Sequence, residues 1–324
     1  MTLLTSRLLV VALGALTLSL SAQAEVTRGS GAGAGNSDSE LVPSGKGWGE
    51  RPGNAHGQSG NVNGNASGNA GKKPGGSNGI TYHGGPVMTN PNGTSVYYIW
   101  YGNWNGNSAT TILTDLANNI APSPYFNINT TYTDAFGASV ANAVHNAGST
   151  ADSYSAGNAL TDNDVKAVVD RAITTGKLPK DSGGVYFVLT SSDVNATSGF
   201  CTQYCGWHTH GTIGGLDIKY AFVGNPDRCP SACAAQSTGP NGNAGADGMA
   251  SIIAHELEEA VTDPQLNAWY DTRGQENADK CAWTFGTTYA AANGASANMK
   301  LGARDYLIQR NWVNASGGYC ATSY

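Results

Sequence analysis

The stretch Val185–Thr190, VYFVLT, decides the fold, because a run of β-branched, aromatic and aliphatic residues is typical of a strand buried on both faces. Such a strand lies inside a sheet that helices cover. The preceding segment, Thr161–Gly176, has the apolar stripe of an amphipathic helix. Thr161 and Asp164 have the spacing of a capping box at its start, and Gly176 is suited to end it.

Further elements are expected on both sides of this unit. Val96–Tyr101 and Lys219–Gly224 are rich in β-branched and aromatic residues and predict two more strands. The residues after Ser108 predict a helix, Asp247–Thr262 predicts a late helix, and Tyr306–Val313 predicts a last strand. This order predicts an α+β or α/β fold, in which a single globular domain has a central mixed sheet flanked by helices.

The N-terminal part of the chain predicts export. Residues 1–24 are typical of a cleavable signal peptide, with Arg7, the apolar run Leu8–Leu20 and the cleavage signal Ala22–Ala24. An uncleaved anchor is the alternative, although the apolar run is short for a membrane span. Residues 25–79 are rich in Gly, Asn and Ser and predict a disordered linker, so the globular domain is expected over residues 80–324. We therefore expect a secreted protein of the extracellular space, the periplasm or the cell wall, without a membrane-spanning helix.

The net charge of the chain indicates which classes of partner it is suited to bind. Loss of Arg7 with the signal peptide would leave 17 − 1 = 16 basic and 23 acidic residues, a net charge of 16 − 23 = −7. An acidic chain is not suited to nucleic acid or to an anionic membrane surface. The expected partner is an extracellular protein or a cell-wall polymer.

An even number of cysteines in an exported chain predicts disulfides. Two C-x-x-x-C pairs and two isolated residues make up the set, and we favour pairing within each C-x-x-x-C unit and between the isolated residues. The six cysteines are Cys201, Cys205, Cys229, Cys233, Cys281 and Cys320. Six cysteines allow 15 connectivities, and a zinc site built from the two C-x-x-x-C pairs is the rival interpretation.

The late helix contains an H-E-x-x-E motif that begins at His255. His255 and Glu259 are four residues apart, so they share one face and can bind one ion. Glu256 stands where the H-E-x-x-H metallopeptidase motif has its general base. Zinc is the expected metal, and a carboxylate in place of the second imidazole also admits manganese or calcium. Glu258 is expected on the solvent side, and the alternative for the whole motif is a surface helix with an acidic run.

A third metal ligand is expected downstream of the helix. The acidic residues there are Asp263, Asp271, Glu276 and Asp279. We favour Glu276, then Asp279, then Asp271. The alternative for each is a turn-capping or solvated carboxylate.

A second cluster surrounds His208 and His210 in the segment Cys205–Gly211, CGWHTHG. In an extended segment the two imidazoles point the same way. They can bind metal or line a pocket beside the H-E-x-x-E site. We favour a third interpretation, in which both histidines are hydrogen-bonded within a disulfide-stapled loop.

Three segments resemble the EXORDIUM, or phosphate-induced, family of secreted proteins. They are His83–Trp104, Gly199–Gly211 and Asp247–Pro264. The resemblance implies extracellular location and a shared fold, and for plant members a link to cell expansion and growth signalling.

The chain resembles the microbial branch of that family, in which H-E-x-x-E is followed by W-x-D and G-x-E-x-x-D. The resemblance places Asp271, Glu276 and Asp279 at those acidic positions. Plant members carry small residues in place of H-E-x-x-E, so the resemblance does not extend the plant growth role to this chain. A sheet followed by an H-E helix is also similar to the catalytic half of zincins, by analogy.

Together these features predict a secreted metal-dependent hydrolase, and specifically a zinc metallopeptidase. The ligands would be His255, Glu259 and either Glu276 or Asp279, and Glu256 would activate water. The alternative is a non-catalytic extracellular or cell-wall binding protein with a structural metal or none. Exposed aromatic residues would then stack on sugars, the candidates being Trp100, Trp104, Trp207 and Trp269.

Overall fold

The computed structural model describes residues 42–46 and 79–324. The predicted signal peptide and most of the predicted linker lie outside the described residues, so the boundaries at residues 24 and 79 stay predictions. Within the described part of the chain, no helix is both long enough and apolar enough to cross a membrane.

A five-stranded sheet forms the centre, with β5 (Gly184–Thr190) in the middle. The strand order is β3-β2-β5-β8-β7. The other strands are β2 (Thr94–Tyr101), β3 (Val144–Asp152), β7 (Gly206–Ile213) and β8 (Leu216–Val223). β2, β3, β5 and β8 are parallel, and β7 is antiparallel at the edge. Every residue of β5 is buried, so the predicted central mixed sheet is confirmed.

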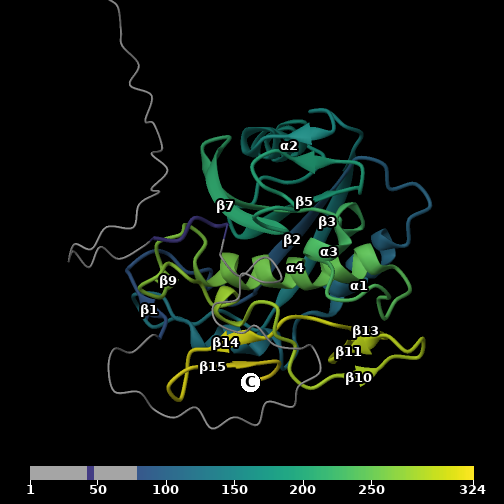
Figure 1. Ribbon diagram of the computed structural model, residues 1–324. Coiled ribbons are helices and arrows are strands. Elements are labelled where there is room, and N and C mark those ends of the chain that lie inside the picture. The colour runs from purple at the N-terminus through teal and green to yellow at the C-terminus, as the bar shows by residue number, and fades with distance from the viewer. Residues whose placement is uncertain (1–41, 47–78) are drawn as a thin grey trace, which may run out of the picture. The chain divides into compact units, whose positions relative to one another are not determined.

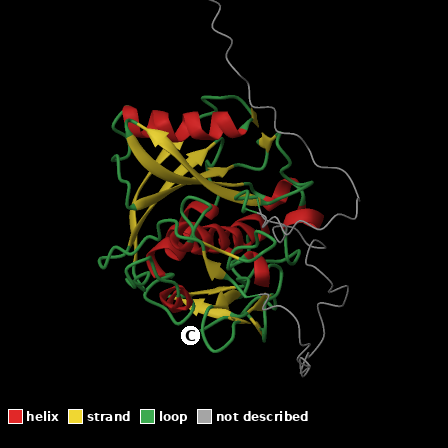
Figure 2. Ribbon diagram, turned by 90° about the vertical axis from the view of Figure 1, so that its left-hand side faces the viewer, coloured by secondary structure: helices red, strands yellow, loops and turns green. Residues whose placement is uncertain are grey.

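Helices cover both faces of the sheet (Figures 1 and 2). α2 (Asp162–Thr174) lies on one face, and α1 (Ala109–Asn119) and α4 (Ala244–Thr262) lie on the other. The capping box of Thr161 and Asp164 is present at the start of α2. Ser108 precedes α1 as predicted, but its side chain makes no capping hydrogen bond.

Short elements complete the fold, and most lie on the side of α4 away from the sheet (Figure 1). They are β1 (Thr81–Tyr82), η1 (Phe126–Thr131), β4 (Ala159–Leu160), β6 (Asn195–Ala196), η2 (Pro226–Arg228), α3 (Pro230–Cys233), β9 (Trp269–Tyr270), η3 (Asp279–Cys281), β10 (Tyr289–Ala290), β11 (Ser296–Ala297), β12 (Met299–Leu301), β13 (Arg304–Tyr306), β14 (Asn311–Val313) and β15 (Tyr319–Ala321). The single strand predicted at residues 306–313 is wrong. Its two ends belong to different hairpins, because β13 pairs with β12 and β14 pairs with β15.

The disulfides differ in part from the favoured pairing. Cys281–Cys320 is present as predicted. The two C-x-x-x-C units are instead joined to each other, by Cys201–Cys229 and Cys205–Cys233. Cys229 and Cys233 are four residues apart at the ends of α3, so they face the same neighbour and each reaches a different cysteine of the other unit. This crossed pairing also removes the rival zinc site, since no described cysteine is free.

Glu258 corrects the predicted solvent face of the late helix. Its side chain is fully buried, and its Oε2 accepts a hydrogen bond from the hydroxyl of Tyr125. The prediction was wrong because α4 is covered by the sheet on one side and by the C-terminal segments, drawn in yellow, on the other (Figure 1). A one-sided amphipathic pattern does not describe a helix inside a domain.

Candidate metal centre

α4 carries the motif residues through the interior of the domain. Asn243 caps the start of the helix, and its side chain accepts a hydrogen bond from the backbone N–H of Ala246. Asp263 follows its last residue, and Oδ1 of Asp263 accepts hydrogen bonds from the backbone N–H groups of Asn267 and Ala268. Both ends are therefore fixed, and the buried second half of the helix has little freedom to turn its side chains outward.

Strand β7 brings His208 onto the same helix. Gly206 makes this close approach possible, because a Cβ on it would lie 2.5 Å from Cγ2 of Ile252 and 2.9 Å from Oε1 of Glu256. His208 is two residues further along, on the same face of the strand. Its imidazole consequently meets α4 between two motif carboxylates.

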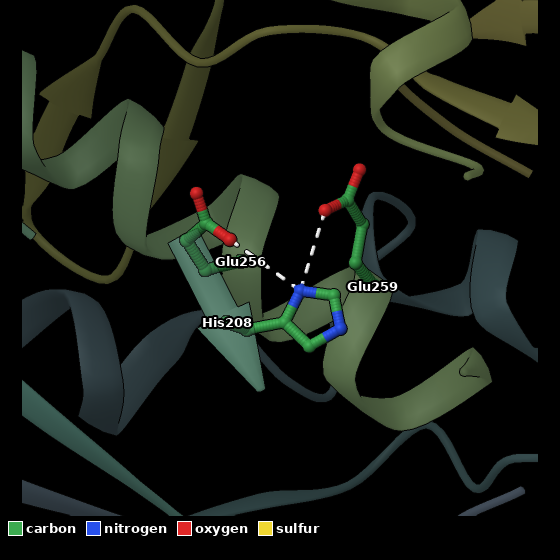
Figure 3. Close-up of side chains that lie close together, drawn as sticks. All are labelled: His208, Glu256 and Glu259. Atoms are coloured by element: carbon green, nitrogen blue, oxygen red, sulfur yellow. Dashed lines mark ion pairs between the residues drawn. The ribbon is translucent and has the colours of Figure 1, made fainter. Parts of the chain in front are cut away.

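The first group of candidate ligands is His208, Glu256 and Glu259, all buried (Figure 3). Nδ1 of His208 lies 3.5 Å from Oε2 of Glu256 and 3.4 Å from Oε2 of Glu259. One ligand atom from each residue lies within 4.8 Å of the others. This spacing allows a single cation to contact all three after small side-chain movements.

The second group is His255, Glu259 and Asp279, and it shares Glu259 with the first. Nε2 of His255 lies 3.1 Å from Oε1 of Glu259 and 3.6 Å from Oδ1 of Asp279. The backbone N–H of Asp279 also donates a hydrogen bond to Oε1 of Glu259. Two oxygens of Glu259 therefore face two different imidazoles.

The downstream acids divide into two kinds. Asp279 joins the His255 group, and Oε1 of Glu276 lies 3.6 Å from Nε2 of His208. Asp271, the third choice, is away from the cluster, where Oδ2 accepts a hydrogen bond from Lys280 and Oδ1 accepts those of two backbone N–H groups. His210 is also outside it, because its Nδ1 pairs with Asp217.

Several buried atoms of the cluster have no hydrogen-bond partner among the described residues. They are Nδ1 of His208, both ring nitrogens of His255, both carboxylate oxygens of Glu256, Oε2 of Glu259, Oε1 of Glu276 and Oδ1 of Asp279. Leaving such groups unpaired in the interior is costly, so native proteins pair them or bind an ion there. A set of imidazole nitrogens and carboxylate oxygens fits a divalent cation, and these groups can hold one.

Electrostatic coupling within the cluster is strong. Burial disfavours a charged His208, but its contacts with Glu256 and Glu259 prevail and raise its pKa to about 10. Burial raises the pKa of Glu256 to about 7, against the opposing influence of His208 and His255. Burial acts in the same direction on Glu259, yet the charge of His255 and the contact with His208 lower its pKa to about 2.

The two downstream carboxyls resist ionisation. Burial, followed by the charges of Glu259 and Asp263, raises the pKa of Glu276 well above its usual value. Burial and the charge of Glu259 also raise the pKa of Asp279. Four carboxyls around two imidazoles are an excess of acidic groups in a low-dielectric space, and a divalent cation there would favour their ionised forms.

Sequence reasoning favoured a hydrogen-bonded loop around His208, and the structure places this residue in a strand against the motif helix. The available signal was the alternation Gly206, His208, His210, which puts a glycine and an imidazole on one face. Three of the four aromatic residues proposed to stack on sugars are not exposed, since Trp100, Trp104 and Trp207 are buried. That part of the sugar-binding hypothesis is wrong, because these indoles pack into the core.

The chain has relatives among known proteins. The family model described as "Phosphate-induced protein 1 conserved region" matches residues 80–317. Protein EXORDIUM-like 3 of Arabidopsis thaliana is 34% identical over 281 residues, which cover 74% of this chain and 82% of the relative. Protein EXORDIUM-like 5 of the same plant is 34% identical over 274 residues, covering 72% and 75%.

Protein PHOSPHATE-INDUCED 1 of Nicotiana tabacum is 31% identical over 139 residues, covering 37% of this chain and 41% of the relative. No solved structure gives a significant match. The family model covers most of the chain, and the first two relatives are covered over three quarters or more of their length. The chain therefore belongs to the EXORDIUM, or phosphate-induced, protein family.

Proposed function

We propose that this protein is a secreted zinc-dependent peptidase of the family's microbial branch. The observation that carries the proposal is the arrangement of unpaired buried atoms around the motif helix. His255, Glu259 and Asp279 converge, and Glu256 lies one residue after the first of them. Three disulfides also support work in an oxidising, extracellular setting.

Each residue of the cluster has a separate role in this proposal. His255, Glu259 and Asp279 would hold the ion, which would supply Lewis-acid polarisation of a peptide carbonyl. Glu256 would take a proton from the attacking water and pass it to the leaving amine as the C–N bond breaks. The neighbouring imidazole of His208 keeps the Glu256 carboxylate oriented toward the cluster.

The placement of the helix beneath an antiparallel edge strand supports the analogy with zincins. β7 is the only antiparallel strand of the five-stranded sheet and lies at its edge, directly over the motif residues of α4. Fold analogy alone does not establish activity, so the proposal rests on the ligand geometry.

Metal analysis of the purified protein, paired with two glutamine variants, tests the proposal. Glu256→Gln should keep the metal and lose hydrolysis of a denatured protein substrate by at least 100-fold. Glu258→Gln is the matched control, because it changes a buried glutamate of the same helix outside both ligand groups. It should keep both metal and hydrolysis. Wild-type protein that binds no transition metal, or hydrolysis that survives Glu256→Gln, would contradict the proposal.

The full burial of Glu256 favours one alternative, a non-catalytic extracellular or cell-wall protein in which the ion only stabilises the fold. Under this alternative a chelator lowers the melting temperature of wild type and of Glu256→Gln equally. No substrate is then hydrolysed by either protein, whereas wall-polymer binding survives Glu256→Gln.

A further inference from the structure

Residues 42–46 lie against the edge strand that carries His208. They form the short purple segment beside β7 in Figure 1. The backbone N–H of His208 donates a hydrogen bond to the carbonyl oxygen of Gly45 at 3.1 Å. β7 pairs with β8 on its other side, so this N–H belongs to the open edge of the sheet.

Two neighbouring residues hold the segment in place. Nζ of Lys46 forms an ion pair with Asp162 in the first turn of α2, and it lies 5.2 Å and 5.3 Å from the ring centres of Tyr204 and Trp207. Pro43 is buried, as is Gly45. The contacts with the domain are therefore specific, although they belong to a Gly-rich stretch.

Gly45 fits this position because it has no side chain. Its φ is +68°, and a Cβ on it would lie 2.0 Å from the carbonyl oxygen of His208. Any other residue would clash with the strand backbone and would also be strained at this φ. A substitution at Gly45 should thus release the segment without touching the domain.

We propose that the outer edge of β7 at His208 binds an extended polypeptide, and that residues 42–46 occupy it as an intramolecular competitor. The proposal names the substrate class of the proposed peptidase. It rests on that function only for the statement that the bound polypeptide is then hydrolysed. An open strand edge recognises extended peptides through backbone hydrogen bonds. A tethered segment has an effective concentration of roughly millimolar, so a few contacts are enough for it to compete with a free peptide.

Peptide binding to the mature full chain tests this proposal. The probe is a fluorescein-labelled peptide with the sequence of residues 40–48, ELVPSGKGW. Gly45→Val should bind it at least 10-fold more tightly than wild type, because the edge is vacated. Val42→Ser is the matched control in the same segment, since Val42 is 63% exposed, and it should behave as wild type. A peptide with Lys46→Glu should not bind any of the three proteins.

Trypsin cleavage after Lys46 gives a second readout. It should become at least 10-fold faster in Gly45→Val than in wild type, because Lys46 loses its partners. Equal peptide affinity in wild type and Gly45→Val, no binding to Gly45→Val, or unchanged cleavage would overturn the proposal. These measurements need no catalysis. If Gly45→Val hydrolyses substrate as wild type does but binds no peptide, only the edge proposal is refuted. If the peptide binds but the protein has neither metal nor hydrolysis, only the proposed peptidase function is refuted.

Discussion

The hydroxyl of Tyr125 lies 2.9 Å from Oε2 of Glu258 and donates a hydrogen bond to it, in a space where the glutamate is fully buried. Burial raises the pKa of Glu258 well above its usual value, and nearby donors only partly oppose this. The carboxyl is therefore neutral over a pH range in which an exposed glutamate is charged. A carboxyl within the motif can in this way be structural rather than catalytic.

Glu258→Gln is expected to change the pH dependence of stability. A raised folded-state pKa contributes stability that is complete below the unfolded pKa, about 4.3, and is lost as pH rises through the folded value. The neutral amide cannot lose a proton, so the variant should lie within about 1 kcal/mol of wild type near pH 4 and should be the more stable protein in alkaline solution. Denaturant unfolding at several pH values measures this. A difference in stability that is the same at every pH would mean instead that folding does not raise the pKa of this carboxyl.

The two candidate ligand groups lead to a prediction of metal stoichiometry. Because they share Glu259, one divalent cation per chain is expected, and His255→Ala should abolish its binding. At a free metal concentration 100 times its dissociation constant, binding should stabilise the fold by about 2.7 kcal/mol. Elemental analysis gives the stoichiometry, and thermal unfolding with and without a chelator gives the stabilisation. Two ions per chain would show instead that each group holds its own ion across Glu259.

Asp279→Asn and Asp271→Asn form a matched pair of variants that distinguishes a metal ligand from a residue that only stabilises the fold. Both aspartates are buried and lie in the segment that follows α4, but only Asp279 belongs to a ligand group. Asp279→Asn should weaken metal affinity by at least 10-fold. Asp271→Asn should keep the affinity within about threefold and lower stability by about 1–3 kcal/mol, because it weakens the bond to Lys280 inside the protein. Calorimetric metal titration of both variants is the measurement. An equal loss of affinity would mean that the acidic segment as a whole, and not Asp279 in particular, supports metal binding.

Sequence patterns predicted the sheet and the motif helix well, because their apolar spacing reflects burial. Val185–Thr190 and Thr161–Gly176 match β5 and α2 to within two residues at each end. β3 gave no such signal, since Val144–Asp152 is a polar edge strand in which eight of the nine residues are exposed or partly exposed. Edge strands carry polar residues that prevent pairing with other chains, so a search for apolar patterns does not detect them.

The candidate site was predictable where its members are close in sequence. The spacing of His255 and Glu259 follows from helix geometry alone. The approach of His208 depends on β7 being folded against α4, and no local pattern specifies that contact. The choice between Glu276 and Asp279 likewise depends on the path of the loop after the helix. For the same reason the disulfides were misassigned, since each C-x-x-x-C spacing fits pairing within or between units.

Gly206→Ala tests the contact that assembles the site. The new methyl would lie 2.5 Å from Cγ2 of Ile252 and 2.9 Å from the carbonyl oxygen of Phe222, both in packed surroundings. Strand β7 must then move away from α4, so we expect a loss of about 1–3 kcal/mol in stability. Metal affinity should fall as well, because His208 lies against the ligand Glu259 and moves with the strand while the residues of α4 stay.

Gly211→Ala is the control for that variant in the same strand. Its methyl would meet Cε of Lys166 at 3.1 Å, the far end of a flexible side chain that can move aside. Stability should stay within about 0.5 kcal/mol of wild type, and metal affinity should be unchanged. If Gly206→Ala lowered stability but left metal affinity intact, His255, Glu259 and Asp279 would hold the cation without support from His208. His208 would then serve only to orient Glu256 and to fix the strand on the helix.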